Sequence, residues 1–162
     1  MTGRHDVTPV VHLRSVEDQD IDVFFDHQAD PQAVEMAAFP ARDWDQFAAH
    51  WAKVRADDTN VVRTIVADGL VAGNIGSWQD NGQQLVGYWV GREWWGRGVA
   101  TRALALLVDE VSTRPLYAHV AAHNVGSIRV LDKCGFRRDR AQEANAPAPD
   151  DGIEEFIFVL NA

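Results

Sequence analysis

The sequence predicts an α/β protein: a mixed sheet of about seven strands with helices on both faces. Segments rich in β-branched residues alternate with segments whose apolar residues recur at i, i+3, i+4 and i+7. Asp-Gly and Asn-Gly pairs, which favour hairpin turns, separate three neighbouring β-type segments. The chain has 162 residues, of which 46% are hydrophobic, and no Pro/Gly/Ser linker divides it. Residues 1–162 are therefore expected to form one domain.

The first third of the chain predicts one strand and two helices. Residues 1–8 show no pattern, and we expect them to be disordered. Weak alternation over residues 10–13 indicates a strand, and helical spacing of apolar residues indicates helices near 17–28 and 44–54. The segment 30–42 contains two prolines and is expected to be a loop.

The centre of the chain predicts an antiparallel meander. Its three strands are expected at residues 61–67, 70–78 and 84–90. The turns between them carry the pairs Asp68-Gly69 and Asn81-Gly82.

The last third predicts two helices and three strands. A long amphipathic helix is expected over residues 98–112, followed by a strand over 116–121 and a short helix over 124–134. A terminal pair of strands, 136–142 and 154–160, would close the sheet across a loop rich in Pro, Ala and Asp.

The overall composition excludes several classes of function. A net charge of −9 disfavours nucleic-acid and anionic-membrane partners, and no apolar run is long enough to span a bilayer. The single cysteine, Cys134, forms no internal disulfide, is interpreted as a buried apolar residue, and is compatible with a reducing cytoplasm. No His, Asp, Glu or Cys spacing indicates a metal site.

A glycine-rich turn lies between the strand at 84–90 and the helix that follows it. Gly96 and Gly98 would present backbone N–H groups at a helix N-terminus, which is a typical anion site. The alternative is that the glycines merely make a tight connection. A nucleotide P-loop is excluded because no Lys-Ser/Thr follows the glycines. A dinucleotide fingerprint is excluded because Thr101 replaces its third glycine and residues 116–121 contain no acid.

At this turn the sequence resembles the GNAT superfamily of N-acetyltransferases, whose acyl-CoA motif reads Arg/Gln-x-x-Gly-x-Gly/Ala. Gly98 and Ala100 match that motif, and Trp95 takes its first position. This tryptophan is typical of the RimJ/RimL-like branch, which resembles ribosomal-protein N-terminal acetyltransferases, although Arg102 replaces a glutamate common there. A second block, residues 124–136, is similar to the branch's Asn-x-x-Ser…Leu-x-Lys-x-Gly-Phe helix.

The resemblance implies the GNAT fold and acetyl-CoA as cosubstrate. Pantetheine would lie in a gap between two splayed strands, against the backbone of Trp89 and Val90 and near the Asn124 side chain, and an N–H near Val90 would stabilise the oxyanion. The pyrophosphate would bind at the turn made of Trp95, Gly96, Arg97, Gly98, Val99, Ala100 and Thr101.

Ser127 is the catalytic candidate, because the resemblance implies that its hydroxyl protonates the leaving thiolate. It follows Asn124 by one helical turn, and the alternative is an ordinary polar residue at a helix start. The general base stays open among a water chain and the side chains of four residues: Glu35, His119, His123 and Glu143. Phe39 and Trp78 could line the acceptor site, although a core position is favoured for each.

The sequence thus predicts a cytoplasmic acetyl-CoA-dependent N-acetyltransferase that acts on a primary amine by direct attack. The acceptor could be a protein N-terminus, a polyamine or an antibiotic amine, and the protein could be a monomer or homodimer. The alternative is a non-catalytic acyl-CoA-binding or sensing module that kept the cofactor motif.

Overall fold

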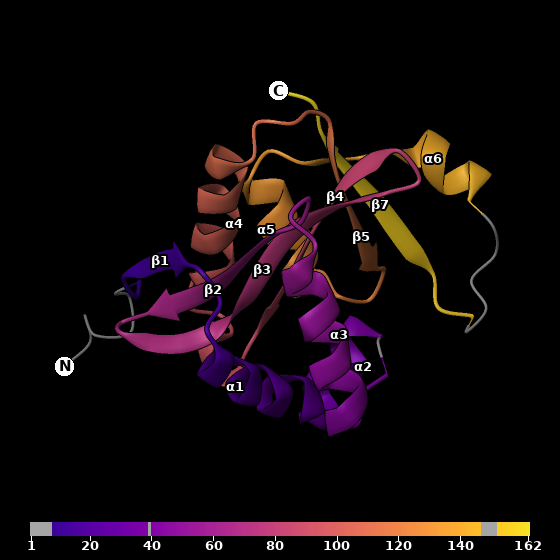
Figure 1. Cartoon of the computed structure of the whole chain (residues 1–162). Coiled ribbons are helices and arrows are strands. Elements are labelled where there is room, and N and C mark those ends of the chain that lie inside the picture. Colours follow the sequence, from indigo (N-terminus) through magenta and orange to yellow (C-terminus); the bar gives the residue numbers. More distant parts are fainter. Residues whose placement is uncertain (1–7, 39, 147–151) are drawn as a thin grey trace.

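The structure, a computed structural model, describes residues 8–38, 40–146 and 152–162. In these residues one seven-stranded sheet carries helices on both faces, as Figure 1 shows, and this confirms the predicted fold class. The expectation of disorder over residues 1–8 falls, apart from Thr8, outside the described residues.

The sheet has the strand order β1-β2-β3-β4-β5-β7-β6. Neighbouring strands are antiparallel except β4 and β5, which are parallel. The strands are β1 (Val11–Arg14), β2 (Val61–Ala67), β3 (Leu70–Asp80), β4 (Gln83–Val90), β5 (Leu116–Ala121), β6 (Arg137–Arg138) and β7 (Glu155–Leu160).

Helices α1–α3 lie on one side of the sheet, and α4 and α5 lie on the other (Figure 1). A short 3₁₀ segment, η2 (Arg92–Trp94), follows β4. The α-helices are α1 (Asp18–Ala29), α2 (Pro31–Ala37), α3 (Trp44–Ala56), α4 (Val99–Glu110), α5 (Val125–Lys133) and α6 (Arg140–Asn145).

Two apolar clusters hold these layers together. The larger one joins the sheet to α4 and α5, with Leu104 and Leu107 of α4 fully buried beside Ile65 and Ile75 of the sheet. The smaller one is largely aromatic and packs α1 and α3 together; its buried members are Ile21, Phe24, Phe47 and Trp51. Fully buried Leu-sized side chains contribute about 1.5–3 kcal/mol each, so the larger cluster dominates stability.

The segment 30–42, expected to be a loop, contains helix α2, so that expectation was wrong. Asp30 caps the helix by accepting a hydrogen bond from the Gln32 N–H, and Pro31 occupies the first turn. Proline is favoured there because its fixed φ suits a helix start and its missing N–H would have no intrahelical partner. The helix ends at Ala38, which adopts a left-handed conformation with φ of 55°.

The expected strand over 136–142 is also wrong for most of its length. Only Arg137 and Arg138 pair with β7, and helix α6 begins at Arg140. Asp139 caps α6 by accepting from the Gln142 N–H. This Asp, followed by good helix formers, was a helix-start signal that the expectation of a closing strand overlooked.

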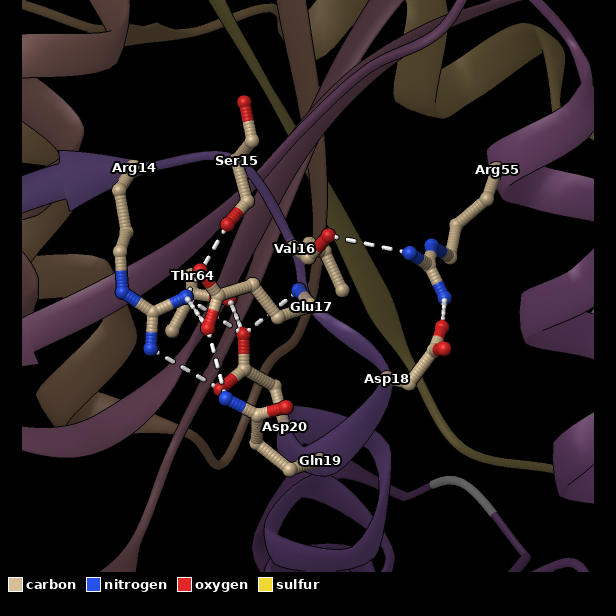
Figure 2. A network of polar contacts seen from close by, with 9 residues as sticks. All are labelled: Arg14, Ser15, Val16, Glu17, Asp18, Gln19, Asp20, Arg55 and Thr64. Carbon is tan, nitrogen blue, oxygen red and sulfur yellow. Dashed lines mark hydrogen bonds and ion pairs between the residues drawn. The ribbon is translucent and has the colours of Figure 1, made fainter.

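A buried carboxylate fixes the start of α1 to the sheet, as Figure 2 shows. Asp20 has no exposed surface and accepts hydrogen bonds from both terminal nitrogens of Arg14, at 2.7 and 3.0 Å. It also accepts from the Glu17 N–H at 2.8 Å and the Thr64 hydroxyl at 2.7 Å. Burial acts to raise the pKa of Asp20, but these hydrogen bonds outweigh it and hold the pKa below its ordinary value.

Candidate active site

A gap opens where the two parallel strands part. Strands β4 and β5 pair only near their beginnings, where Gln84 lies opposite Leu116 and Leu85 opposite Tyr117. Within the described residues, positions 86–90 of β4 have no partner on β5. Backbone polar groups in such a gap need partners, so an extended ligand could pair with β4 in the place that β5 leaves.

The backbone of Val90 faces this gap. In the antiparallel β3–β4 pair, the Gly91 N–H donates to the Ala72 carbonyl at 2.8 Å. Because backbone groups along a strand alternate between facing the partner and facing away, the N–H of Val90 points away from β3. By the same alternation the backbone of Trp89 points toward β3, so its part in cofactor binding stays a prediction.

The turn after β4 brings the N-terminus of α4 to the mouth of the gap. Gly96 and Gly98 have φ of 72° and 80°, a left-handed conformation that favours glycine. No side chain caps α4, and its first backbone bond within the helix joins the Arg102 N–H to the Gly98 carbonyl. The N–H groups of the first turn therefore point out of the helix end, where the dipole favours an anion.

The bulky side chains of the turn hold its shape. The Trp95 indole donates to the Val90 carbonyl at 2.9 Å and so ties the turn to the end of β4. Trp94 is buried in the larger apolar cluster, and the Arg97 guanidinium lies 4.6 Å from the centre of the Trp94 ring. Val99 is buried in the core, so only its backbone can face a ligand.

Ser127 lies on the α4–α5 face of the sheet, in contact with a residue that the sequence analysis missed. Its hydroxyl is 2.6 Å from the Tyr88 hydroxyl. The side-chain oxygen of Asn124 accepts from the Ser127 N–H at 3.1 Å, so Asn124 caps α5 and the Ser127 hydroxyl does not. Burial raises the pKa of Tyr88 to about 12, although the hydrogen bond to Ser127 opposes the shift, so the phenol is neutral near pH 7.

The four residues considered as the general base do not gather at one site in the structure, although His123 and Glu35 are neighbours. His119 is on the surface, 3.1 Å from Glu155, and the ring of His123 contacts the Glu35 backbone carbonyl at 2.9 Å. Glu143 is bonded to Arg138 and to the Ile157 N–H, and the Arg138 hydrogen bond holds the pKa of Glu143 below its ordinary value. The contacts of His119 and Glu143 are thus structural.

A cavity of about 450 Å³ lies on the opposite face of the sheet, between α1, α3 and strands β2–β4. It is bounded by Tyr88 and Trp89, which belong to the stretch of β4 that has parted from β5. The cavity therefore adjoins the gap through β4. Trp78 lines the cavity and is 38% exposed, so the core position favoured for it was wrong, whereas Phe39 lies outside the described residues.

The sequence analysis also missed His50, which lines this cavity from α3. Burial, and then the charges of Arg42 and Lys53, hold the pKa of His50 below its ordinary value, so its ring is neutral near pH 7. His50 gave no motif signal. Tyr88 gave one, because a tyrosine in a buried strand needs a partner for its hydroxyl.

A family model described as an acetyltransferase (GNAT) domain matches residues 11–137. The chain belongs to the GNAT acetyltransferase family. Among curated relatives of this GNAT chain, an "uncharacterized N-acetyltransferase p20" of Bacillus licheniformis is 29% identical over 86 residues, which are 51% of the chain and 48% of the relative. The chain spans about half the length of the curated relatives it matches.

Solved structures share the whole fold of this GNAT chain. RimJ of Mycobacterium smegmatis, in complex with a CoA disulfide, has a TM-score of 0.76 at 22% identity, covering 95% of this chain and 83% of RimJ. Spermidine N-acetyltransferase of Vibrio cholerae, in complex with CoA and spermine, has a TM-score of 0.77 at 14% identity. The match covers 93% of this chain and 95% of the spermidine enzyme. At these identities the likeness shows the fold and leaves the acceptor open.

The described residues contain no group of three or more His, Cys, Asp or Glu placed to hold a metal ion. In the same part of the chain no helix is long and apolar enough to cross a membrane.

Proposed function

We propose that this GNAT protein is an N-acetyltransferase of the RimJ/RimL-like type that transfers the acetyl group of acetyl-CoA to a primary amine. The observation that carries the proposal is the gap beyond Leu85, where β4 leaves β5 and the N-terminus of α4 lies at the open end. The gap provides unpaired strand for pantetheine, and the helix end provides N–H groups for the pyrophosphate.

The cofactor contacts follow from this arrangement. The turn from Gly96 to Thr101 would bind the pyrophosphate, and the amide NH₂ of Asn124 would donate to pantetheine, since its oxygen already accepts from Ser127. The N–H of Val90 would face the thioester oxygen and stabilise the oxyanion. Family membership and the CoA complexes of RimJ and of the spermidine enzyme support acetyl-CoA as cosubstrate.

The chemistry is direct attack. The uncharged amine nitrogen bonds to the acetyl carbon, the C–S bond breaks, and sulfur leaves as a thiolate. The hydroxyls of Ser127 and Tyr88 would stabilise that sulfur by hydrogen bonding as charge develops on it, the thiolate would then take its proton from solvent, and the amine proton would pass to solvent or to His50. The single cysteine supports a reducing compartment, and we propose the cytoplasm.

The test measures binding and turnover on the same sample. Acetyl-CoA at about 100 times its Kd should stabilise the fold by about 2.7 kcal/mol and raise Tm by about 5–10 °C, because only the folded chain has the gap. Thiol release from acetyl-CoA should then depend on an added amine, with mass spectrometry showing the acetylated product. Binding without turnover across protein N-termini, polyamines, aminoglycosides and aromatic amines would identify the sensing module instead.

A further inference from the structure

The cavity beside β4 is lined by several large aromatic side chains. Its lining rings come from α1, α3, β3 and β4, and they are Phe24, Phe47, Trp51, Trp78 and Trp89, whereas the Tyr88 ring points to the other face of the sheet, toward Ser127. Phe24 and Trp51 pack with ring centres 5.0 Å apart, which keeps the inner wall apolar and closely packed. A pocket of this size and lining suits a small apolar body with few polar groups.

One glycine, Gly87, leaves room for the outer wall. A Cβ at position 87 would lie 2.8 Å from the Trp78 ring, so the ring can lie over the strand only because Gly87 has no side chain. Trp78 is 38% exposed, which places it at the mouth of the cavity. Gly76, also in the lining, lies opposite Gly87 across the β3–β4 pair.

The polar groups of the lining give a cation no counter-charge. Among the described residues that line the cavity there is no Asp or Glu, and Arg42 is there with a positive charge. The amide of Gln28 is occupied by the Arg42 backbone, at 3.0 and 3.1 Å. A second ammonium group on the acceptor would lose its hydrating water in the cavity and find no carboxylate there. Cation–π contacts with the rings would stabilise it by less than the free energy that this desolvation costs.

We propose that the acceptor is a compact primary amine whose body is an apolar aromatic group and which carries no second cation. The proposal rests on the acetyltransferase function proposed above. The ring binds between the aromatic walls, and the apolar surroundings favour the uncharged amine that attacks. The nitrogen gains the acetyl group, CoA leaves as the thiolate that is then protonated, and the amine proton passes to solvent.

The experiment compares 2-phenylethylamine, propylamine and spermidine as acceptors, with thiol release as the readout on the full chain. We expect kcat/KM for 2-phenylethylamine to exceed that for spermidine by at least about 100-fold, because the pocket leaves the second cation without a partner. Propylamine should fall between them, since it has the amine without the ring. Faster turnover of spermidine, or of a peptide with an aromatic N-terminal residue, overturns the proposal.

A pair of tryptophan variants tests the location. Trp78→Ala should raise the KM for 2-phenylethylamine about tenfold while kcat for this amine stays nearly unchanged. The KM for propylamine, which has no ring, should also stay nearly unchanged. Trp44→Ala is the matched control, since Trp44 is 43% exposed, packs edge-on to Phe25 and does not line the cavity. An unchanged KM in Trp78→Ala overturns the assignment. If acetyl-CoA raises Tm but no amine is acetylated, the acetyltransferase function itself is overturned.

Discussion

At the scale of single residues, the contact between Ser127 and Tyr88 gives the proposed leaving-group step its physical form. The two hydroxyls are hydrogen-bonded at 2.6 Å, and the pKa of Tyr88, raised to about 12 by burial, keeps the phenol protonated. A thiol has a pKa of about 8.5, so complete transfer from tyrosine to a thiolate is unfavourable. In the proposed mechanism the pair therefore acts chiefly by hydrogen bonding to the sulfur as charge develops on it.

Replacing Ser127 by alanine should lower turnover about 100-fold and leave acetyl-CoA affinity nearly unchanged, because the hydroxyl is needed only as the thiolate forms. Stability should fall by about 1 kcal/mol, because the Tyr88 hydroxyl loses its partner while α5 keeps its Asn124 cap. Steady-state rates and thermal melts on one preparation check both points.

Tyr88→Phe is the companion variant, because it removes one hydroxyl and keeps the ring. We expect a smaller loss, about tenfold, since water can bond to Ser127 in place of the phenol. Normal turnover in Ser127→Ala would exclude Ser127 from the mechanism and leave a cofactor-binding site only.

At the scale of elements, the connection from β4 to α4 depends on backbone shape more than on side-chain chemistry. Left-handed φ at Gly96 and Gly98 turns the chain so that the N–H groups of α4 face outward. The side chains of Trp94, Trp95 and Arg97 pack around the turn and limit its alternatives. We therefore expect acetyl-CoA affinity to be sensitive to the glycines.

Gly98→Ala should lower acetyl-CoA affinity at least tenfold, because the methyl group strains the left-handed backbone that directs the N–H groups of the turn and would lie 3.3 Å from the Thr8 side chain. Gly82→Ala is the matched control: Gly82 has φ of 79° and lies in the β3–β4 hairpin turn. Both variants should lose about 1 kcal/mol of stability, but only Gly98→Ala should bind acetyl-CoA more weakly by calorimetry. Equal affinity in the two would place the pyrophosphate elsewhere.

At the scale of the whole molecule, the Asp20 network joins elements that are distant in the sequence. It links α1 to β1 through Arg14 and to β2 through Thr64, and so it sets where α1 lies over the sheet (Figure 2). Helix α1 supplies Phe24 to the wall of the cavity. The network therefore contributes both to stability and to the shape of the proposed acceptor site.

Asp20→Asn should destabilise the fold by about 2–3 kcal/mol near neutral pH, because an amide group would face the donors that the carboxylate now satisfies. The pKa of Asp20 is lower in the folded state than in the unfolded chain. Its stabilisation is therefore fully present at pH values above the unfolded pKa of about 3.9 and is lost as the pH falls through the folded pKa. Urea unfolding from about pH 7 to pH 3 should thus show the difference from wild type shrinking only at the acid end.

Asp18→Asn is the control for this series, because Asp18 is 96% exposed and forms a surface ion pair with Arg55 at 2.8 Å. Exposed pairs contribute about 0–1 kcal/mol, so this variant should remain close to wild type. A loss in Asp20→Asn no larger than in Asp18→Asn would contradict the role given to the buried network.

Local patterns in the sequence determined most of the elements and the glycine-rich turn before α4. The spacing of apolar residues predicted α3 and α4, the Asp-Gly and Asn-Gly pairs predicted the meander, and the run from Gly96 to Thr101 predicted the helix end at the gap. These signals lie within a few residues of one another. Helix α2 and helix α6 also had such signals, in Pro31 at a first turn and Asp139 as a cap, and were missed because neighbouring prolines and an expected final strand outweighed them.

Only the tertiary structure decided which distant residues meet. Tyr88 and Ser127 are 39 positions apart, Asp20 and Thr64 are 44 apart, and no local pattern pairs them. The proposed acceptor cavity is likewise built from helices α1 and α3 and strands β2–β4, and its lack of carboxylates among the described lining residues appears only once α1 and α3 are packed on the sheet. The physical reason is that hydrogen bonds and burial depend on distance in space, which the sheet order and the packing of helices set.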